Sequence, residues 1–272
     1  MQKLAINFCF LFLFFLFSHN SKSDEAETIF IPCKVKECNP KLRSTFTVWY
    51  KGEKSKPAII WFGGGDSTST DIFYQPIKLL KRKFDIIMVA SPLPIMTNKS
   101  TDGFPRNAYN KYSVYRSKQV LEYYKNKLNK PIWLGGTSSG GPRMIGVLSG
   151  NEKDRPSDGF AGLIFSTPYL ARINSSNGSH RFNIRVSKIK YKMDLPILVF
   201  NHARDHKAAQ HPKKQEWFTK QLAKKNSNKT ELKLLTEGDP KITYHDGGHH
   251  WFEDNKEEVA RVVEKFILDN TK

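Results

Sequence analysis

Cysteine is scarce in this chain, which has three in 272 residues. Cys9 lies in an apolar segment near the amino terminus, so Cys33 and Cys38 are the pair left for the rest of the chain. A C-x4-C pair with no further cysteine and no nearby histidine is a poor zinc site. We therefore expect no metal in this protein.

Long apolar runs are also missing, except at the amino terminus. Residues 4–17 are mostly apolar and rich in Phe and Leu, Lys3 precedes them, and the polar residues 18–23 follow. The run is short for a bilayer span and has the basic start and small-residue exit of a signal peptide. We expect residues 1–23 to be a signal peptide and the protein to be secreted or periplasmic. An uncleaved membrane anchor is the alternative.

Export would change the chemistry of the remaining cysteines. Two thiols in an oxidising compartment favour a disulfide, so we predict a bridge between Cys33 and Cys38, with two free thiols as the alternative. The closed loop would be short, so the bridge would pin the amino-terminal region and add little global stability.

Acidic residues are outnumbered, with 26 Asp and Glu against 44 Lys and Arg and a formal net charge of +18. Such a balance suits an anionic surface or substrate. The basic residues are dispersed, however, and the chain has no basic helix, zinc spacing or aromatic–basic repeat typical of a nucleic-acid module. We expect no nucleic-acid partner, a mostly solvated basic surface, and at most weak association with anionic surfaces.

The feature richest in information is GTSSG at residues 136–140. The apolar run PIWL at residues 131–134 precedes it, and residues 141–149 follow with apolar positions at helical spacing. A Ser between two glycines at a strand-to-helix turn is a nucleophile elbow, because the sharp bend needs small flanking residues and exposes the hydroxyl. We predict that Ser138 is a nucleophile.

A nucleophilic Ser needs a base, and the base needs an orienting carboxylate. Asp205 follows the apolar run PILVF at residues 196–200, and the carboxyl ends of strands are where open α/β sheets place their sites. Near the last predicted helix, DGGHHW at residues 246–251 holds His249 and His250 in a glycine-containing turn.

This order of Ser, acid and His resembles the α/β-hydrolase family over nearly the whole exported chain. A strand at residues 56–62 that runs into Gly63-Gly64-Gly65 adds to the resemblance, since family members carry an HG or HGGG-type oxyanion loop there. Phe62 stands where the family commonly has His. The resemblance implies that the amides of Gly64 and Ser139 form the oxyanion hole, and Gly65 could replace Gly64.

The resemblance also selects among the candidate residues. Family turns place the catalytic His after small residues with an aromatic residue soon after, which favours His249 over His250. We expect Gly65, His250 and Trp251 to contact substrate. Asp205 is favoured as the acid because the preceding strand is followed by no carboxylate, and Asp246 is interpreted as a turn former. The remaining candidates near the acid, His202 and His206, are interpreted as polar loop residues.

The alternation of strands and helices predicts a single α/β domain over residues 24–272 with a mostly parallel sheet. The resemblance implies the α/β-hydrolase fold, with about eight strands, helices on both faces and a small cap or none. Strands are expected at residues 28–33, 44–50, 57–62, 84–90, 131–134, 159–166, 196–200 and 231–236. Helices are expected at residues 71–83, 110–128, 141–149 and 213–225 and near the carboxyl terminus. Residues 169–192 stand where the family inserts its variable cap.

Together these features predict an exported serine hydrolase that cleaves carboxylic esters of modest size through Ser138, His249 and Asp205, without a cofactor. A peptidase or acyl transferase with the same triad is an alternative, because the triad does not specify the leaving group. A non-catalytic surface-binding protein on a hydrolase scaffold is a second alternative, which the intact set of Ser, Asp and His argues against.

Overall fold

The computed structural model describes residues 26–32, 45–63, 75–90, 106–138, 140–168, 170, 186–205, 211–236 and 255–271. Ser138 and Asp205 lie within these ranges. The other predicted site residues lie outside them: Gly64, Gly65, Ser139, His249, His250, Trp251, Cys33 and Cys38. The predicted signal peptide and most of the predicted cap segment lie outside them as well.

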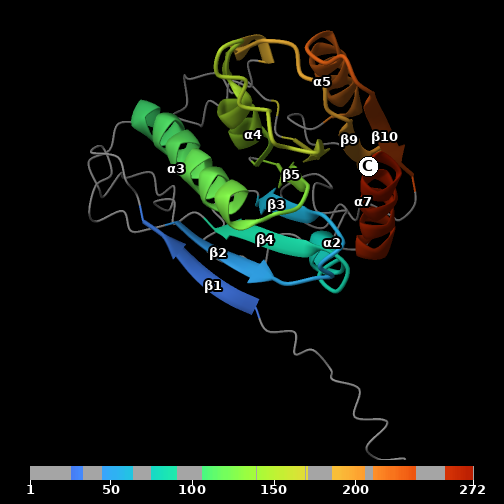
Figure 1. Ribbon diagram of the computed structural model, residues 1–272. Coiled ribbons are helices and arrows are strands. Elements are labelled where there is room, and N and C mark those ends of the chain that lie inside the picture. Colours follow the sequence, from blue (N-terminus) through green and yellow to red (C-terminus); the bar gives the residue numbers. More distant parts are fainter. Residues whose placement is uncertain are drawn as a thin grey trace, which may run out of the picture.

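An eight-stranded sheet forms the centre of the molecule (Figure 1). Its strands in spatial order are β1 (Ala26–Ile31), β2 (Thr45–Tyr50), β4 (Asp85–Ala90), β3 (Ala58–Phe62), β5 (Ile132–Thr137), β7 (Gly162–Ser166), β9 (Ile197–His202) and β10 (Thr230–Leu235). β2 pairs antiparallel with both β1 and β4, and every other pair in this sheet is parallel. The predicted mostly parallel sheet of about eight strands is confirmed.

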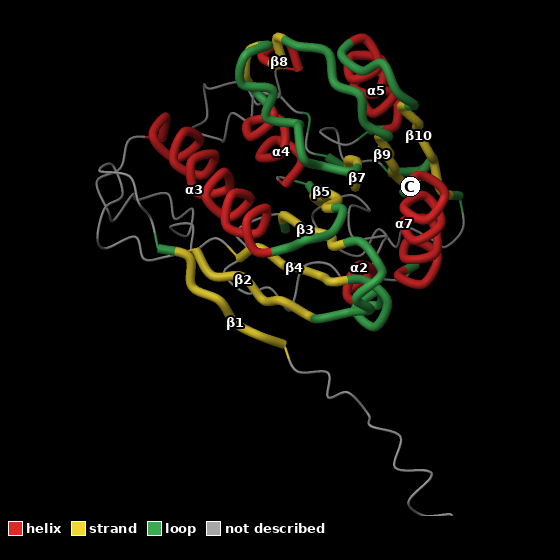
Figure 2. The backbone as a smooth tube through the Cα atoms, viewed as in Figure 1, coloured by secondary structure: helices red, strands yellow, loops and turns green. Residues whose placement is uncertain are grey.

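Helices cover both faces of this sheet, as predicted (Figure 2). The helices are α2 (Gln75–Lys78), α3 (Arg106–Lys127), α4 (Gly140–Leu148), α5 (Pro212–Lys224) and α7 (Lys256–Asn270). α3, α4 and α5 contribute side chains to one apolar core, while α2 and α7 contribute to a second core on the opposite face. Fully buried strands such as β3, β5, β7 and β9 read as continuous apolar runs because helices cover both of their faces.

The last helix follows its predicted apolar stripe closely. Val259, Val262, Val263, Phe266 and Ile267 are all buried on α7, as the 3.6-residue period requires. The helix expected at residues 71–83 ends earlier than predicted, because α2 ends at Lys78 and residues 79–83 form turns. Residues 71–74 of the predicted helix lie outside the described residues. None of the described helices is long and apolar enough to span a bilayer.

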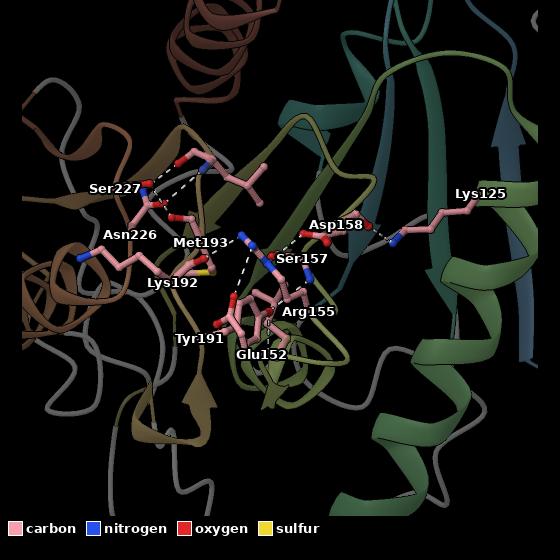
Figure 3. A network of polar contacts seen from close by, with 12 residues as sticks. Lys125, Glu152, Arg155, Ser157, Asp158, Tyr191, Lys192, Met193, Asn226 and Ser227 are labelled. Atoms are coloured by element: carbon pink, nitrogen blue, oxygen red, sulfur yellow. Dashed lines mark hydrogen bonds and ion pairs between the residues drawn. The ribbon is translucent and has the colours of Figure 1, made fainter.

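Two short segments at the amino-terminal edge of the sheet form a separate two-stranded pairing that the sequence did not predict. β6 (Gly150–Asn151) and β8 (Ile189–Lys190) run parallel. A polar network holds this region together (Figure 3). The buried hydroxyl of Tyr191 donates to the Leu148 carbonyl at 2.9 Å and accepts the Ser157 N–H at 3.1 Å, and burial raises its pKa above the ordinary tyrosine value. These bonds brace the edge opposite the carboxyl ends of the strands.

Candidate functional site

Ser138 is the first residue after β5 and has a left-handed backbone, with a φ of 50°. A residue with a Cβ is uncommon in that region and pays a steric cost there, so such strain is kept only where the surrounding structure fixes it. Two backbone bonds do so here. The Ser138 N–H donates to the Ser166 carbonyl on β7 at 3.1 Å, and the Gly141 N–H donates to the Ser138 carbonyl at 3.1 Å. The predicted elbow at a strand-to-helix turn is therefore present.

The glycines of the motif are required by close packing. A Cβ added to Gly140 would lie 2.2 Å from the Phe62 carbonyl oxygen, and one added to Gly136 would lie 2.9 Å from the backbone of Gly140. Real Cβ atoms do not approach backbone that closely, so a larger residue at either position would force β3, β5 and α4 apart. The GxSxG spacing thus reflects contact between three elements.

The end of β3 reaches the elbow. The Gly63 carbonyl oxygen would lie 3.2 Å from a Cβ on Gly140, so the first residue of the glycine run lies against the start of α4. Gly64 and Gly65 follow in the chain and lie outside the described residues, as does Ser139. A buried hydrogen bond also joins β3 to the end of β5, since the indole Nε1–H of Trp61 donates to Thr137 Oγ1 at 3.1 Å.

Asp205 lies in a tight turn at the carboxyl end of β9 and is buried, with 1% of its surface exposed. The turn is held by His202, the last residue of β9. The Arg204 N–H donates to His202 Nδ1 at 3.1 Å, and the Asp205 N–H donates to the His202 carbonyl at 3.1 Å. The prediction that Asp205 leaves the carboxyl end of a strand is confirmed, and the strand extends two residues further than expected.

The spacing of the strands separates Ser138 from Asp205. β7 lies between β5 and β9, with Thr137 opposite Ser166 and Ser166 opposite Phe200. Neighbouring strands are about 4.8 Å apart, so the ends of β5 and β9 are separated by roughly 10 Å. At this separation Ser138 and Asp205 cannot hydrogen-bond directly, and a third side chain would fit between them.

The buried histidine of this edge cannot be that third group in its neutral form. His202 Nδ1 accepts the Arg204 N–H, so the ring proton is assigned to Nε2 from the hydrogen bond. An imidazole with its proton on Nε2 has no free acceptor nitrogen left to take a proton from Ser138. His202 therefore has a structural role in the acid turn, where the sequence had suggested an ordinary loop residue.

Thr167 is a further feature of this edge that sequence reasoning missed. It follows β7, has a φ of 40° and is fully buried. Its Oγ1 has no hydrogen-bond partner among the described residues, and a β-branched residue in the left-handed region is a true outlier. Nothing in the sequence of residues 164–168, IFSTP, predicts such strain. Two strained residues thus end the neighbouring strands β5 and β7.

Metal-binding groups are not assembled in the described part of the chain, where no three His, Cys, Asp or Glu side chains lie together. The chemistry that the described residues can support is nucleophilic, with a strained Ser on one strand and a buried carboxylate two strands away.

Comparison with known proteins gives independent evidence on the fold. No protein-family profile and no curated protein matches the sequence. Solved structures do match over most of the chain. An esterase from Pyrococcus furiosus is similar with 14% identity, coverage of 91% of both chains and a TM-score of 0.59. Esterase 2 of Thermogutta terrifontis, in a structure phosphorylated by paraoxon, has 13% identity, coverage of 90% of this chain and 94% of that chain, and a TM-score of 0.56.

A third structure, Est1E from Butyrivibrio proteoclasticus, has 16% identity, coverage of 89% of this chain and 99% of that chain, and a TM-score of 0.55. The chain has the α/β-hydrolase fold. At these identities the likeness concerns the fold, and it confirms the fold class that the motif order predicted. In this α/β-hydrolase fold, Ser138 and Asp205 occupy the carboxyl ends of β5 and β9.

Proposed function

We propose that this protein is an exported serine hydrolase that cleaves carboxylic esters through Ser138, His249 and Asp205. One observation carries the proposal: Ser138 is held at positive φ in a strand-to-helix turn, on the same sheet edge as the buried Asp205. Strain of this kind is kept where it serves a site. The similar esterases named above support ester substrates.

His249 is proposed as the base because it follows β10, the neighbour of β9, in the order that the fold uses. Its segment, residues 237–254, leaves the carboxyl end of β10 and leads to α7. An imidazole from that segment would bridge the gap of roughly 10 Å between the ends of β5 and β9. His202, the described alternative, already uses its Nδ1 within the acid turn.

The reaction follows from these roles. Ser138 Oγ attacks the ester carbonyl carbon while His249 takes the hydroxyl proton, and Asp205 fixes the imidazole tautomer and stabilises its charged form. The tetrahedral intermediate collapses, the C–O bond to the alcohol breaks, and the alcohol leaves with the proton from His249. Water then attacks the acyl-enzyme, gives its proton to His249, and the acid is released as the proton returns to Ser138.

Negative charge on the tetrahedral oxygen needs backbone donors, for which we propose the amides of Ser139 and of Gly64 or Gly65. The contact between Gly63 and Gly140 supports this assignment, because it starts the glycine run beside the elbow. Removing one such donor typically lowers kcat by about 10²–10³. Gly65, His250 and Trp251 are proposed to contact the substrate.

The preferred substrates are proposed to be esters of modest size. The end of the predicted cap segment, residues 186–190, forms a short 3-10 helix and β8 at the opposite edge of the sheet, so residues 169–185 are left between β7 and β9 to form a cap, and they are mostly polar and basic. So short a segment offers little apolar wall for a long acyl chain, and burying each CH₂ contributes about 0.8 kcal/mol. Peptidase or acyl-transferase activity with the same residues is the second candidate. It is favoured only because a Ser-His-Asp triad does not specify the leaving group.

The experiment is a p-nitrophenyl ester series of increasing acyl length with the wild type and matched variants. We expect kcat/KM to be highest for short acyl chains, and Ser138→Ala and His249→Ala to abolish turnover. Asp205→Asn should lower kcat by up to about 10⁴, because the imidazole then adopts the wrong tautomer. His250→Ala should mainly raise KM.

Asp246→Asn is the matched control for the acid assignment, since Asp246 is the carboxylate nearest to His249 in the sequence. If Asp246→Asn loses activity while Asp205→Asn keeps it, the acid assignment is wrong. A kcat/KM that rises with the longest acyl chains would show an apolar groove and contradict the substrate proposal. Hydrolysis of amides but not of esters would favour the peptidase.

A further inference from the structure

The outer surface of α5 carries one exposed tryptophan in a row of lysines. Lys213, Trp217, Lys220 and Lys224 are spaced four, three and four residues apart, and all four are exposed. At about 100° per residue they share an arc of roughly 60° on the helix. We call these four residues the lysine–tryptophan stripe.

This stripe lies opposite the face that α5 uses to pack on the sheet. Gln215, Phe218, Thr219 and Leu222 are the buried residues of the helix, and α5 runs along the periphery beside β9 and β10 (Figure 1). Packing within the domain therefore accounts for the inner face of α5 and leaves the stripe facing solvent.

Trp217 is unusual because 52% of its surface is exposed. By contrast, Trp49 is 7% exposed, and the ammonium groups of Lys51 and Lys127 both lie 4.9 Å from its ring. Within the described ranges, no ring or ammonium group packs on Trp217 in that way. Trp217 therefore presents an exposed indole ring on the same helix face as three cationic side chains.

The charge of α5 indicates the partner. The helix has four lysines and a single acidic residue, Glu216, which lies to one side of the stripe. Indole rings favour the interface between water and hydrocarbon, and lysines on the same helix face favour anionic headgroups. The stripe is about 16 Å long and lies on the convex surface of a helix, so it can contact a flat partner surface along its whole length.

We propose that the lysine–tryptophan stripe of α5 docks the protein on an anionic lipid bilayer. Trp217 would enter the headgroup layer while the three lysines contact lipid phosphates. The proposal does not depend on the proposed hydrolysis. A nucleic-acid strand is less suitable, because stacking platforms present several aromatic rings along a groove and the stripe has one.

The test is sedimentation with vesicles of phosphatidylcholine, alone or with about one third phosphatidylglycerol. We expect the wild type to bind only the anionic vesicles, and less at high salt. Each stripe lysine should contribute about fivefold to binding. The triple variant Lys213→Gln, Lys220→Gln, Lys224→Gln should therefore lose about 10²-fold, and Trp217→Ser should also bind more weakly.

A matched control removes three positive charges elsewhere, with Lys54→Gln and Arg82→Gln in turns and Lys265→Gln on α7. It has the same net charge as the stripe variant and should keep nearly full binding. Equal losses in both triple variants would show that net charge alone binds the vesicles and would overturn the proposal. Absence of wild-type binding would overturn it too, as would a stripe variant impaired only toward a single-stranded oligonucleotide. Turnover of a soluble ester should be unchanged in all of these variants, so this result stands apart from the test of hydrolysis.

Discussion

At the scale of single residues, His202 fixes the turn that presents Asp205. Its Nδ1 accepts the N–H of the residue two positions on, which is the bond that an Asn or Asp side chain makes in an Asx turn. The chain repeats the device at His211, whose Nδ1 accepts the Lys213 N–H at 3.3 Å and caps α5. In both places the imidazole accepts a backbone hydrogen bond that a short polar side chain such as Asn or Asp usually accepts.

His202 is therefore a positioning residue, and two substitutions separate that role from packing. His202→Phe keeps a ring of similar size without the acceptor, whereas His202→Asn keeps an acceptor at the right spacing. A lost neutral hydrogen bond is worth about 1 kcal/mol, so kcat should fall by roughly fivefold to tenfold in His202→Phe with little change in KM.

The comparison of the two variants decides the point. His202→Asn should recover most of kcat even where its Tm is the lower of the two, because it leaves a cavity. If kcat instead follows Tm in both variants, His202 only fills space.

Sequence reasoning placed Ser138 and Asp205 at this edge but did not predict their local bonds. Ser138 could be predicted because a sharp turn has a glycine signature, and Asp205 because it follows an apolar run. The His202 bond and the φ of Thr167 could not, since both depend on a turn geometry that composition does not encode. For the same reason, the choice between His249 and His250 still rests on the resemblance.

At the scale of elements, the contact between α4 and β3 sets the geometry of the elbow. Gly140→Ala would place a Cβ 2.2 Å from the Phe62 carbonyl, whose position is fixed by the sheet. We expect a loss of about 1–3 kcal/mol in the free energy of unfolding. We also expect the folded variant to lose esterase activity, because α4 must move away from Ser138.

Gly146→Ala is the matched control, because it makes the same change in the same helix. There the added Cβ would lie 2.4 Å from a methyl group of Val114, a side chain that can give way as α3 and α4 adjust. Alanine also gains about 1 kcal/mol of helix propensity over glycine, so the net change should be small and activity should remain. Urea unfolding and ester turnover measure both variants; equal effects would contradict the account of the motif.

The elements themselves were predictable where their hydrophobic pattern was long. The buried strands match the prediction to within a few residues because apolar runs dominate there, and the predicted apolar stripe of the closing helix is buried on α7. β6 and β8 were missed because two residues carry no period. α3 begins four residues before its predicted start, directly after Pro105, a helix-start signal that the prediction did not use.

At the scale of the whole molecule, export and the Cys33–Cys38 bridge remain proposals. The motive is the signal-like start and the cysteine pair that it leaves. We predict that the protein recovered outside the cytoplasm begins near Asp24, and that its cysteines react with an alkylating reagent only after reduction. Intact mass measures both points, and a retained amino terminus or freely alkylated thiols would count against them.

The central claim is that Ser138 is an activated nucleophile, and covalent labelling tests it most directly. The protein is treated with a fluorophosphonate probe, and the modified peptide is identified by mass spectrometry. The account predicts one adduct per chain, on Ser138, that is absent in Ser138→Ala and slowed in His249→Ala and Asp205→Asn, because the base and its carboxylate activate the hydroxyl. A folded protein that takes no label, or takes it on another serine, would contradict the account.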